Sequence, residues 1–298
     1  MKYFFLFFFL SFAVYGCVKK TLLDHDFEAN LLLTEARIDA STGVEIYLTK
    51  TFSPQETVNL DTLVIADASI TLFENNDSIG ELLYDEDSFK YYYTNLNNIV
   101  PGNTYAIEIV VAGYPVVYSE PIVLIDSPAL DFVSIVRTND TTEFYSQTEV
   151  TFNLSDNLEE DNMYLIDWFV GSNEYYEELQ IHVKDGSILD CATPIKPYLL
   201  DNCFNGLNDI PITIYASYGN SIFSFIDDFE GFNSVATDTT IFNFRSVDEF
   251  GQKYLRSQSY SIFEEEQTSV PPITFSNMSN GIGVFYSVGN KSYTLTSP

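Results

Sequence analysis

The sequence has very few of the residues that hydrolytic enzymes commonly use. Only two histidines, His25 and His182, occur in 298 residues. Ser–His–Asp triads and His-based metal sites need an imidazole beside a nucleophile or beside further ligands, so both are nearly excluded. A G-x-S-x-G elbow, a phosphate-binding glycine loop and a zinc-binding helix pair are also missing from the chain. This composition favours a protein that is not an enzyme.

Basic residues are equally scarce. Thirteen Lys and Arg stand against 43 Asp and Glu, which gives a formal net charge of −30. Binding to nucleic acid needs clustered cations, and resting on an anionic lipid surface needs them too. The balance argues against both kinds of partner. It suits an exported protein that is kept soluble by mutual repulsion.

Long apolar runs are lacking except at the N-terminus, which reads MKYFFLFFFLSFAVYGC. Lys2 supplies a positive charge, and the apolar residues 3–14 follow. Twelve residues are too few to span a bilayer as a helix, which takes about 20, but they match the apolar region of a secretory signal. We therefore predict a signal peptide over residues 1–16.

The end of this segment, Val14-Tyr15-Gly16-Cys17, resembles a bacterial lipobox. The prediction is that the mature chain begins at Cys17 with an acylated N-terminus, followed by a tether over residues 17–28. Two or three acyl chains are enough for stable anchoring. The alternative is an ordinary cleaved signal in which Cys17 has no role.

Only three cysteines are present, and lipid would occupy the first. Cys191 and Cys203 are then the one possible pair, and in an oxidising compartment we expect them to form a disulfide. Closing such a short loop would stabilise the fold by about 3 kcal/mol. A metal site is the alternative, but no further Cys or His stands nearby.

Carboxylates are abundant, so the composition allows an acid–base pair or a calcium site. Asp156, Glu159, Asp161 and Asn162 offer oxygen ligands within one loop, although their spacing follows no known calcium loop. The simpler interpretation of such acidic clusters is a solvated turn. No cofactor is expected.

Strand signals fill most of the chain. Residues 29–125 hold short segments rich in β-branched and aromatic residues, with period-two alternation and Asn, Asp or Pro-Gly turns between them. They predict an Ig-like or transthyretin-like β-sandwich. Residues 126–298 predict a second β-rich domain, with the disulfide loop and a final glycine-punctuated hairpin over 276–296. The expected fold is mainly β, with two packed antiparallel sandwich-like domains.

One segment departs from the strand pattern. Ser246 and Glu249 form a capping-box signature, and apolar residues then recur at helical spacing. We predict a single helix over residues 247–264.

Aromatic residues make up 16% of the chain, which raises the possibility of a stacking platform for a sugar or peptide. The candidates are Trp168, the pair Tyr175-Tyr176 and the run Tyr91-Tyr92-Tyr93. Alternating aromatics are also what sandwich cores are built from, and that interpretation is favoured.

Two stretches in the last third, residues 226–231 (IDDFEG) and 276–285 (SNMSNGIGVF), resemble an uncharacterised domain-of-unknown-function family of Bacteroidota lipoproteins. Residues 68–72 (ASITL) and 101–105 (PGNTY) look like the same family. The likeness covers essentially the mature chain. The chain departs from the family in having Asn280-Gly281 where a glycine pair is common, and in its disulfide loop.

The resemblance implies an outer-membrane lipoprotein, often encoded beside a TonB-dependent receptor. We therefore expect a non-enzymatic accessory or cargo-binding partner of such a transporter, held to membrane lipid through Cys17, with a small ligand or peptide as possible cargo. The alternatives are a surface hydrolase with a carboxylate pair, and an adhesion or scaffold lipoprotein. Lys19 and Lys20 stand where an acidic export cue would be expected, so either membrane face remains open.

Overall fold

The computed structural model describes residues 31–52, 63–140, 145–155, 163–172, 175–178, 181–183, 198–200, 206–219, 239–263 and 275–296. Within these ranges the protein is mainly β, with one α-helix near the C-terminus, as the sequence predicts. That helix is not long and apolar enough to cross a membrane.

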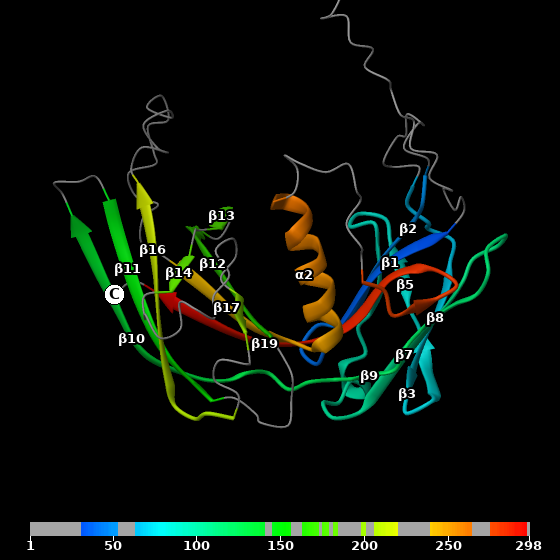
Figure 1. Cartoon of the computed structure of the whole chain (residues 1–298), viewed down its shortest axis with the longest axis horizontal. Coiled ribbons are helices and arrows are strands. Elements are labelled where there is room, and N and C mark those ends of the chain that lie inside the picture. Colours follow the sequence, from blue (N-terminus) through cyan, green and yellow to red (C-terminus); the bar gives the residue numbers. More distant parts are fainter. Residues whose placement is uncertain are drawn as a thin grey trace, which may run out of the picture.

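The strands form three sheets, and Figure 1 labels most of them. Those of the first half are β1 (Leu32–Asp39), β2 (Gly43–Lys50), β3 (Ser69–Glu74), β4 (Asp77–Glu81), β5 (Leu83–Asp85), β6 (Lys90–Tyr93), β7 (Thr104–Val110), β8 (Val117–Ser119) and β9 (Ile122–Val123), with a 3-10 turn η2 (Leu96–Asn98). Those of the second half are β10 (Ala129–Asp140), β11 (Tyr145–Ser155), β12 (Met163–Ser172), β13 (Tyr175–Glu178), β14 (Ile181–Val183), β15 (Tyr198–Leu200), β16 (Ile210–Gly219), β17 (Thr239–Val247), β18 (Met278–Ser279) and β19 (Ile282–Thr296).

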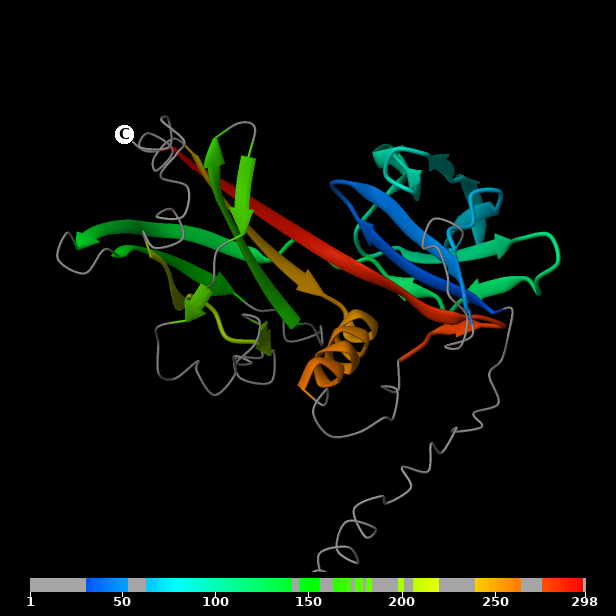
Figure 2. The same ribbon diagram turned by 90° about the horizontal axis from the view of Figure 1, so that it is seen from above.

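A nine-stranded sheet joins the two halves of the chain. Its order is β13-β12-β17-β19-β1-β2-β6-β5, with β15 also paired to β12. The strand at the junction is β19, which pairs with β17 along its C-terminal part and with β1 along its N-terminal part. Figures 1 and 2 show this long red strand running from one half of the molecule to the other. The sheet therefore crosses the predicted boundary at residue 125.

The pairing of β1 with β19 is parallel, whereas every other pairing between the described strands is antiparallel. The sequence predicts antiparallel sheets, because short strands follow one another with no helical period between them. Period-two alternation does not distinguish parallel from antiparallel neighbours, so it gives no sign of this pairing. The close approach of the two strands requires glycine at position 283, where a Cβ would lie 1.8 Å from the carbonyl oxygen of Thr34. Gly283 also has a φ of +131°, which favours glycine.

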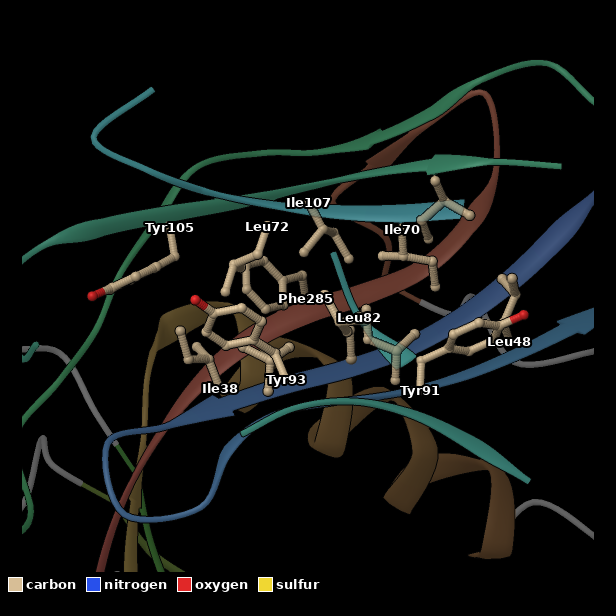
Figure 3. Packing of buried hydrophobic residues seen from close by; sticks show 14 of the residues in the cluster. Ile38, Leu48, Ile70, Leu72, Leu82, Tyr91, Tyr93, Tyr105, Ile107 and Phe285 are labelled. Atoms are coloured by element: carbon tan, nitrogen blue, oxygen red, sulfur yellow. The ribbon is translucent and has the colours of Figure 1, made fainter. Parts of the chain in front are cut away.

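The first half forms a sandwich between part of this sheet and a six-stranded sheet, β18-β8-β7-β3-β4 with β9 on β7. Its core is built from the inward residues of both sheets, shown in Figure 3. One of its fully buried side chains, Phe285, comes from the far end of the chain. The first sandwich is therefore completed by a residue of β19.

The second half packs a four-stranded sheet, β10-β11-β16-β14, near β17 and the C-terminal part of β19. Aromatic rings fill the space between them: Phe152 of β11 stacks on Phe242 of β17 with centroids 4.5 Å apart, and lies 5.3 Å from Tyr293. The Tyr293 hydroxyl donates to the carbonyl oxygen of Leu130. The alternating aromatics of these strands are core residues.

Helix α2 spans Glu249–Phe263, close to the predicted 247–264. Its N-terminal cap is not the predicted Ser246, whose hydroxyl donates to the carbonyl oxygens of Asp126 and Gly289. Asp248 takes that role, because its Oδ1 accepts the N–H of Gly251 at 2.8 Å. Ser246 is still paired within β17, so its side chain serves the sheet.

The predicted hairpin over 276–296 is wrong. A turn at Asn280-Gly281 does connect β18 to β19, but β18 pairs with β8, and β19 continues without a turn through Gly289-Asn290. At Gly289 a Cβ would lie 1.9 Å from the carbonyl oxygen of Asp126. The glycine that suggests a turn in the sequence is needed here for close packing of two backbones.

Candidate functional site

The candidate site is the face of the nine-stranded sheet that points away from both sandwich cores, hereafter the outer face. Alternation along β1 defines it: Leu32, Thr34, Ala36 and Ile38 are buried, whereas the residues between them are exposed or half-buried. On the neighbouring strands, the residues that pair in register with these exposed positions belong to the same face. Helix α2 lies on this face.

Helix α2 covers the middle of the outer face. Val284, Tyr286 and Val288 of β19 point to this side and are buried in a cluster with Tyr254 of the helix. Phe250 packs against the same cluster and stacks on Phe275 with centroids 5.9 Å apart. This apolar contact fixes the helix over the seam between the two halves.

Beside the helix, charged side chains form a network across β1, β2 and β6. Glu45 is at its centre: its Oε1 lies 2.5 Å from Arg37 Nη2 and 3.5 Å from Lys90 Nζ. The Lys90 ammonium also lies 5.7 Å from the centre of the Tyr47 ring, within cation–π range. These pairs are partly exposed, so they contribute little to stability and hold the side chains in defined positions.

The helix also contacts β1 beside this network, through a tyrosine hydroxyl. Tyr254 Oη donates to Glu35 Oε2 at 3.2 Å. Glu35 pairs with Tyr47 on β2 and with Val284 on β19, so it stands between the helix and the exposed ring. Helix α2 therefore borders the surface on which Tyr47 is exposed.

Beneath the helix, the buried Tyr286 phenol holds its proton more strongly than an exposed tyrosine does. Burial is the main cause that raises the pKa of Tyr286 to about 12; the negative charge of Glu35 acts in the same direction and Arg37 in the opposite direction. The Tyr286 phenol is therefore a neutral group at physiological pH.

On the far side of α2 a second polar group lies on the same sheet. Arg245 of β17 forms an ion pair with Asp167 of β12, and the Ser292 hydroxyl lies 2.6 Å from Asn243 Oδ1. Both sides of the helix thus carry paired charges and hydrogen-bonding groups.

This arrangement is suited to binding a polar partner through aromatic and hydrogen-bonding contacts. Tyr47 is 40% exposed and Leu83 on β5 is 76% exposed, so apolar contact area is available next to the charged pairs. Among the described residues, no three His, Cys, Asp or Glu side chains are grouped to hold a metal ion.

The residues predicted for lipidation, disulfide formation and calcium binding all lie outside the described residues. These are Cys17, Cys191, Cys203, Asp156, Glu159, Asp161 and Asn162. Each of these assignments stays a prediction.

The aromatic run of β6 is divided between two environments. Tyr91 and Tyr93 are buried, and their hydroxyls donate to the carbonyl oxygens of Ile65 and Ile79. Tyr92 lies between them in the strand, half-buried on the outer face opposite Glu45. Two of the three thus fit the core interpretation, and one is available to the site. Trp168 lies in β12 and the pair Tyr175-Tyr176 in β13.

Sequence reasoning missed Glu35, Arg37, Glu45 and Lys90, because single charges alternating with apolar residues look like an ordinary solvated face. A usable sequence signal was Asp39 followed by Ser41, a pattern typical of a tight turn. In the structure, Asp39 Oδ1 accepts the N–H of Ser41 at 2.6 Å. This turn sets the register that pairs Arg37 with Glu45.

No curated protein matches the chain. The family model described as "Domain of unknown function (DUF4249)" matches residues 20–294, nearly the whole of the sequence. The chain therefore belongs to the DUF4249 family.

Proposed function

We propose that this protein is an outer-membrane lipoprotein, acylated at Cys17, that serves as a non-enzymatic accessory or cargo-binding partner of a TonB-dependent transporter. The observation that carries the proposal is the place of β1. It is the first described strand after the N-terminal segment, and it lies inside the nine-stranded sheet with β19 on one side and β2 on the other. A lipid at Cys17 would hold the whole body through an internal strand.

The length of the intervening chain limits how far the body can stand from the membrane. Thirteen residues lie between Cys17 and Leu31, where the described fold begins. Even fully extended they reach only about 50 Å. The body would stay at the membrane surface, within contact distance of an integral membrane partner.

The outer face supports the binding part of the proposal. It presents Tyr47, Tyr92 and Leu83 beside the charges of Arg37 and Lys90, both paired with Glu45. Aromatic groups with nearby charge pairs are typical of surfaces that bind protein or polar ligands. Cargo or transporter would bind there, next to α2.

Affinity purification from detergent-solubilised membranes of the native host tests this function. The full chain carries a C-terminal tag, and recovered partners are identified by mass spectrometry. The expected result is co-purification of a large outer-membrane β-barrel transporter. Repeated recovery of the protein alone, from membranes that contain it, would contradict the proposal.

A matched pair of variants then locates the contact. Tyr47 and Leu96 are 40% and 42% exposed, but Tyr47 lies in β2 on the outer face, whereas Leu96 lies in the 3-10 turn η2 outside the strands. Tyr47→Ala should lower recovery of the transporter severalfold, and Leu96→Ala should leave it unchanged. Equal recovery with both variants would exclude the outer face as the contact.

A further inference from the structure

The hairpin that joins β7 to β8 is unusual for so acidic a chain. From Ile109 to Ser119 the sequence reads IVVAGYPVVYS, with no charged residue between Glu108 and Glu120. Val110 is 42% exposed, and Ala112, Gly113 and Pro115 are exposed as well. The tip therefore presents an apolar, uncharged surface to its surroundings.

The geometry of the tip is defined. Tyr114 N–H donates to the carbonyl oxygen of Val111 at 3.2 Å and closes the turn. Gly113 has a φ of +86°, and no other heavy atom lies within 4 Å of where its Cβ would be. The turn projects away from the rest of the molecule, as Figure 1 shows beside the label of β8.

The hairpin lies at the end of the sandwich where the chain enters from the N-terminal segment. Asn280 Nδ2 donates to the carbonyl oxygen of Val116 at 2.9 Å, which attaches the hairpin to the turn before β19. At the adjacent Gly281, a Cβ would meet both a Val117 methyl at 3.0 Å and the carbonyl oxygen of Leu32 at 3.1 Å. The start of β1 and the base of the hairpin are thus neighbours.

Two further apolar side chains are exposed at this end. Leu33 follows the first residue of β1 and is 41% exposed, and Phe52 follows the last strand residues of β2 and is 42% exposed. Leu31 and Thr51 are joined by two hydrogen bonds, of 2.9 and 3.1 Å, which place Phe52 next to the entry of the chain. These exposed apolar side chains therefore lie at the same end of the sandwich as the hairpin, near the point where the N-terminal segment enters.

We propose that the β7–β8 hairpin rests in the headgroup region of a bilayer whose lipids carry no net charge. The inference rests on the anchoring at Cys17 proposed above. An N-terminal lipid would hold this end of the sandwich close to the membrane and so raise the local concentration of the hairpin there. A hairpin with only weak affinity for the bilayer would then still be bound for much of the time. Uncharged lipids are the fitting partner, because a chain with net charge −30 is repelled by an anionic surface.

Fluorescence on vesicles tests the hairpin without relying on Cys17. Residues 1–17 are replaced by a hexahistidine tag, which retains every residue that the structure describes, and the protein is held on phosphatidylcholine vesicles that contain a nickel-chelating lipid. The native tryptophan is removed by Trp168→Phe, and a single tryptophan is introduced by Ala112→Trp. Its emission should shift to shorter wavelength and be quenched severalfold by brominated phosphatidylcholine.

The matched control is Val123→Trp in the same background. Val123 is 53% exposed in the same sandwich, but β9 pairs with the opposite end of β7, at Thr104 and Tyr105. Its emission should not respond to brominated lipid, and circular dichroism confirms that both variants fold alike. Equal quenching at both positions, or none at Ala112→Trp, would overturn the proposal and leave the hairpin to a protein partner.

Vesicle charge provides a second arm. Replacing much of the phosphatidylcholine with phosphatidylglycerol should reduce quenching of the Ala112→Trp variant, whereas stronger quenching would refute the assignment to uncharged lipid. The tag anchors the protein in this experiment, so the quenching measures hairpin insertion whether or not Cys17 is lipidated in cells. Lipidation is tested separately, by membrane fractionation of the full chain.

Discussion

Asp248 and Ser287 bind each other through two hydrogen bonds, although they are 39 positions apart. The Asp248 N–H donates to the Ser287 carbonyl oxygen at 3.2 Å, and the Ser287 N–H donates to Asp248 Oδ2 at 2.8 Å. The other carboxylate oxygen caps helix α2. One buried side chain thus fixes both the start of the helix and its position on β19.

Removing this carboxylate should destabilise the protein. Asp248→Ala leaves the buried N–H of Ser287 without its acceptor and removes the helix cap, which together predict a loss of about 2–4 kcal/mol in the free energy of unfolding. Urea titration followed by circular dichroism measures it. Glu249→Gln changes an exposed neighbour and should alter the midpoint little, so equal effects of the two changes would argue against the role of Asp248.

The same residue predicts a pH dependence. Burial raises the pKa of Asp248 from 3.8 to about 6, against the opposing effect of hydrogen bonds from Gly251 and Ser287. The folded state therefore holds this proton more tightly than the unfolded state. The resulting contribution to stability is complete below about pH 4 and is lost as the pH rises through 6.

Comparison with Asp248→Asn isolates that contribution, since the amide does not titrate. The difference in unfolding free energy between wild type and Asp248→Asn should shift in favour of the wild type on going from pH 7 to pH 4. The measurement is a set of urea titrations across this range. A difference that stays constant with pH would show that the carboxyl does not titrate there.

Phe285→Ala tests whether the two halves depend on each other. Phe285 is fully buried in the core of the first sandwich, yet it belongs to the last strand. Its truncation should cost about 3–5 kcal/mol. Because β19 is shared, we expect one unfolding transition that moves as a whole, seen by calorimetry; a variant in which only part of the heat absorption shifts would mean that the halves unfold separately.

Gly289 should tolerate no side chain. In Gly289→Ala the methyl group would overlap the Asp126 carbonyl oxygen, which belongs to backbone and cannot rotate away, so we expect a loss of about 3 kcal/mol or more. Gly102→Ala is the matched control: its φ is +84° and its Cβ would meet no atom within 4 Å. That change should cost only about 1–2 kcal/mol, from backbone conformation alone. Thermal melting of both variants gives the comparison.

Membrane attachment is tested directly by Cys17→Ser. The thiol is the atom that would be acylated, so the variant should move from the membrane fraction to the soluble fraction when cells expressing the full chain are fractionated. Wild type that appears in the soluble fraction, or a variant that stays in the membrane fraction, would contradict lipidation at Cys17.

Local sequence signals located β1 and helix α2, but they did not identify the partners of these elements. The alternation along residues 32–39 marked β1 and its buried face, and the helical spacing after Ser246 located α2 to within two residues at each end. The cap was misassigned because Ser246 and Asp248 are both good capping residues. Which of them caps depends on the end of β17, which is set by its pairing with β19.

The charged network of the outer face could not be predicted from the sequence. Glu45 is one charge among many in the sequence, and it becomes the centre of a network because β1 and β6 bring Arg37 and Lys90 to it from opposite sides. Tyr91, Tyr92 and Tyr93 look alike in sequence. The pleat of the strand directs the first and third into the core and the second to the surface.

The sequence alone determined that the chain is acidic and mainly β, with a helix near residues 247–264, because composition and local periodicity are properties of neighbouring residues. Only the tertiary structure decided that β19 would lie parallel to β1 and join both halves in one sheet. Strand partners 249 positions apart, such as Leu33 and Ile282, leave no local trace, since their pairing is settled by which faces and which glycines can approach closely in the folded protein.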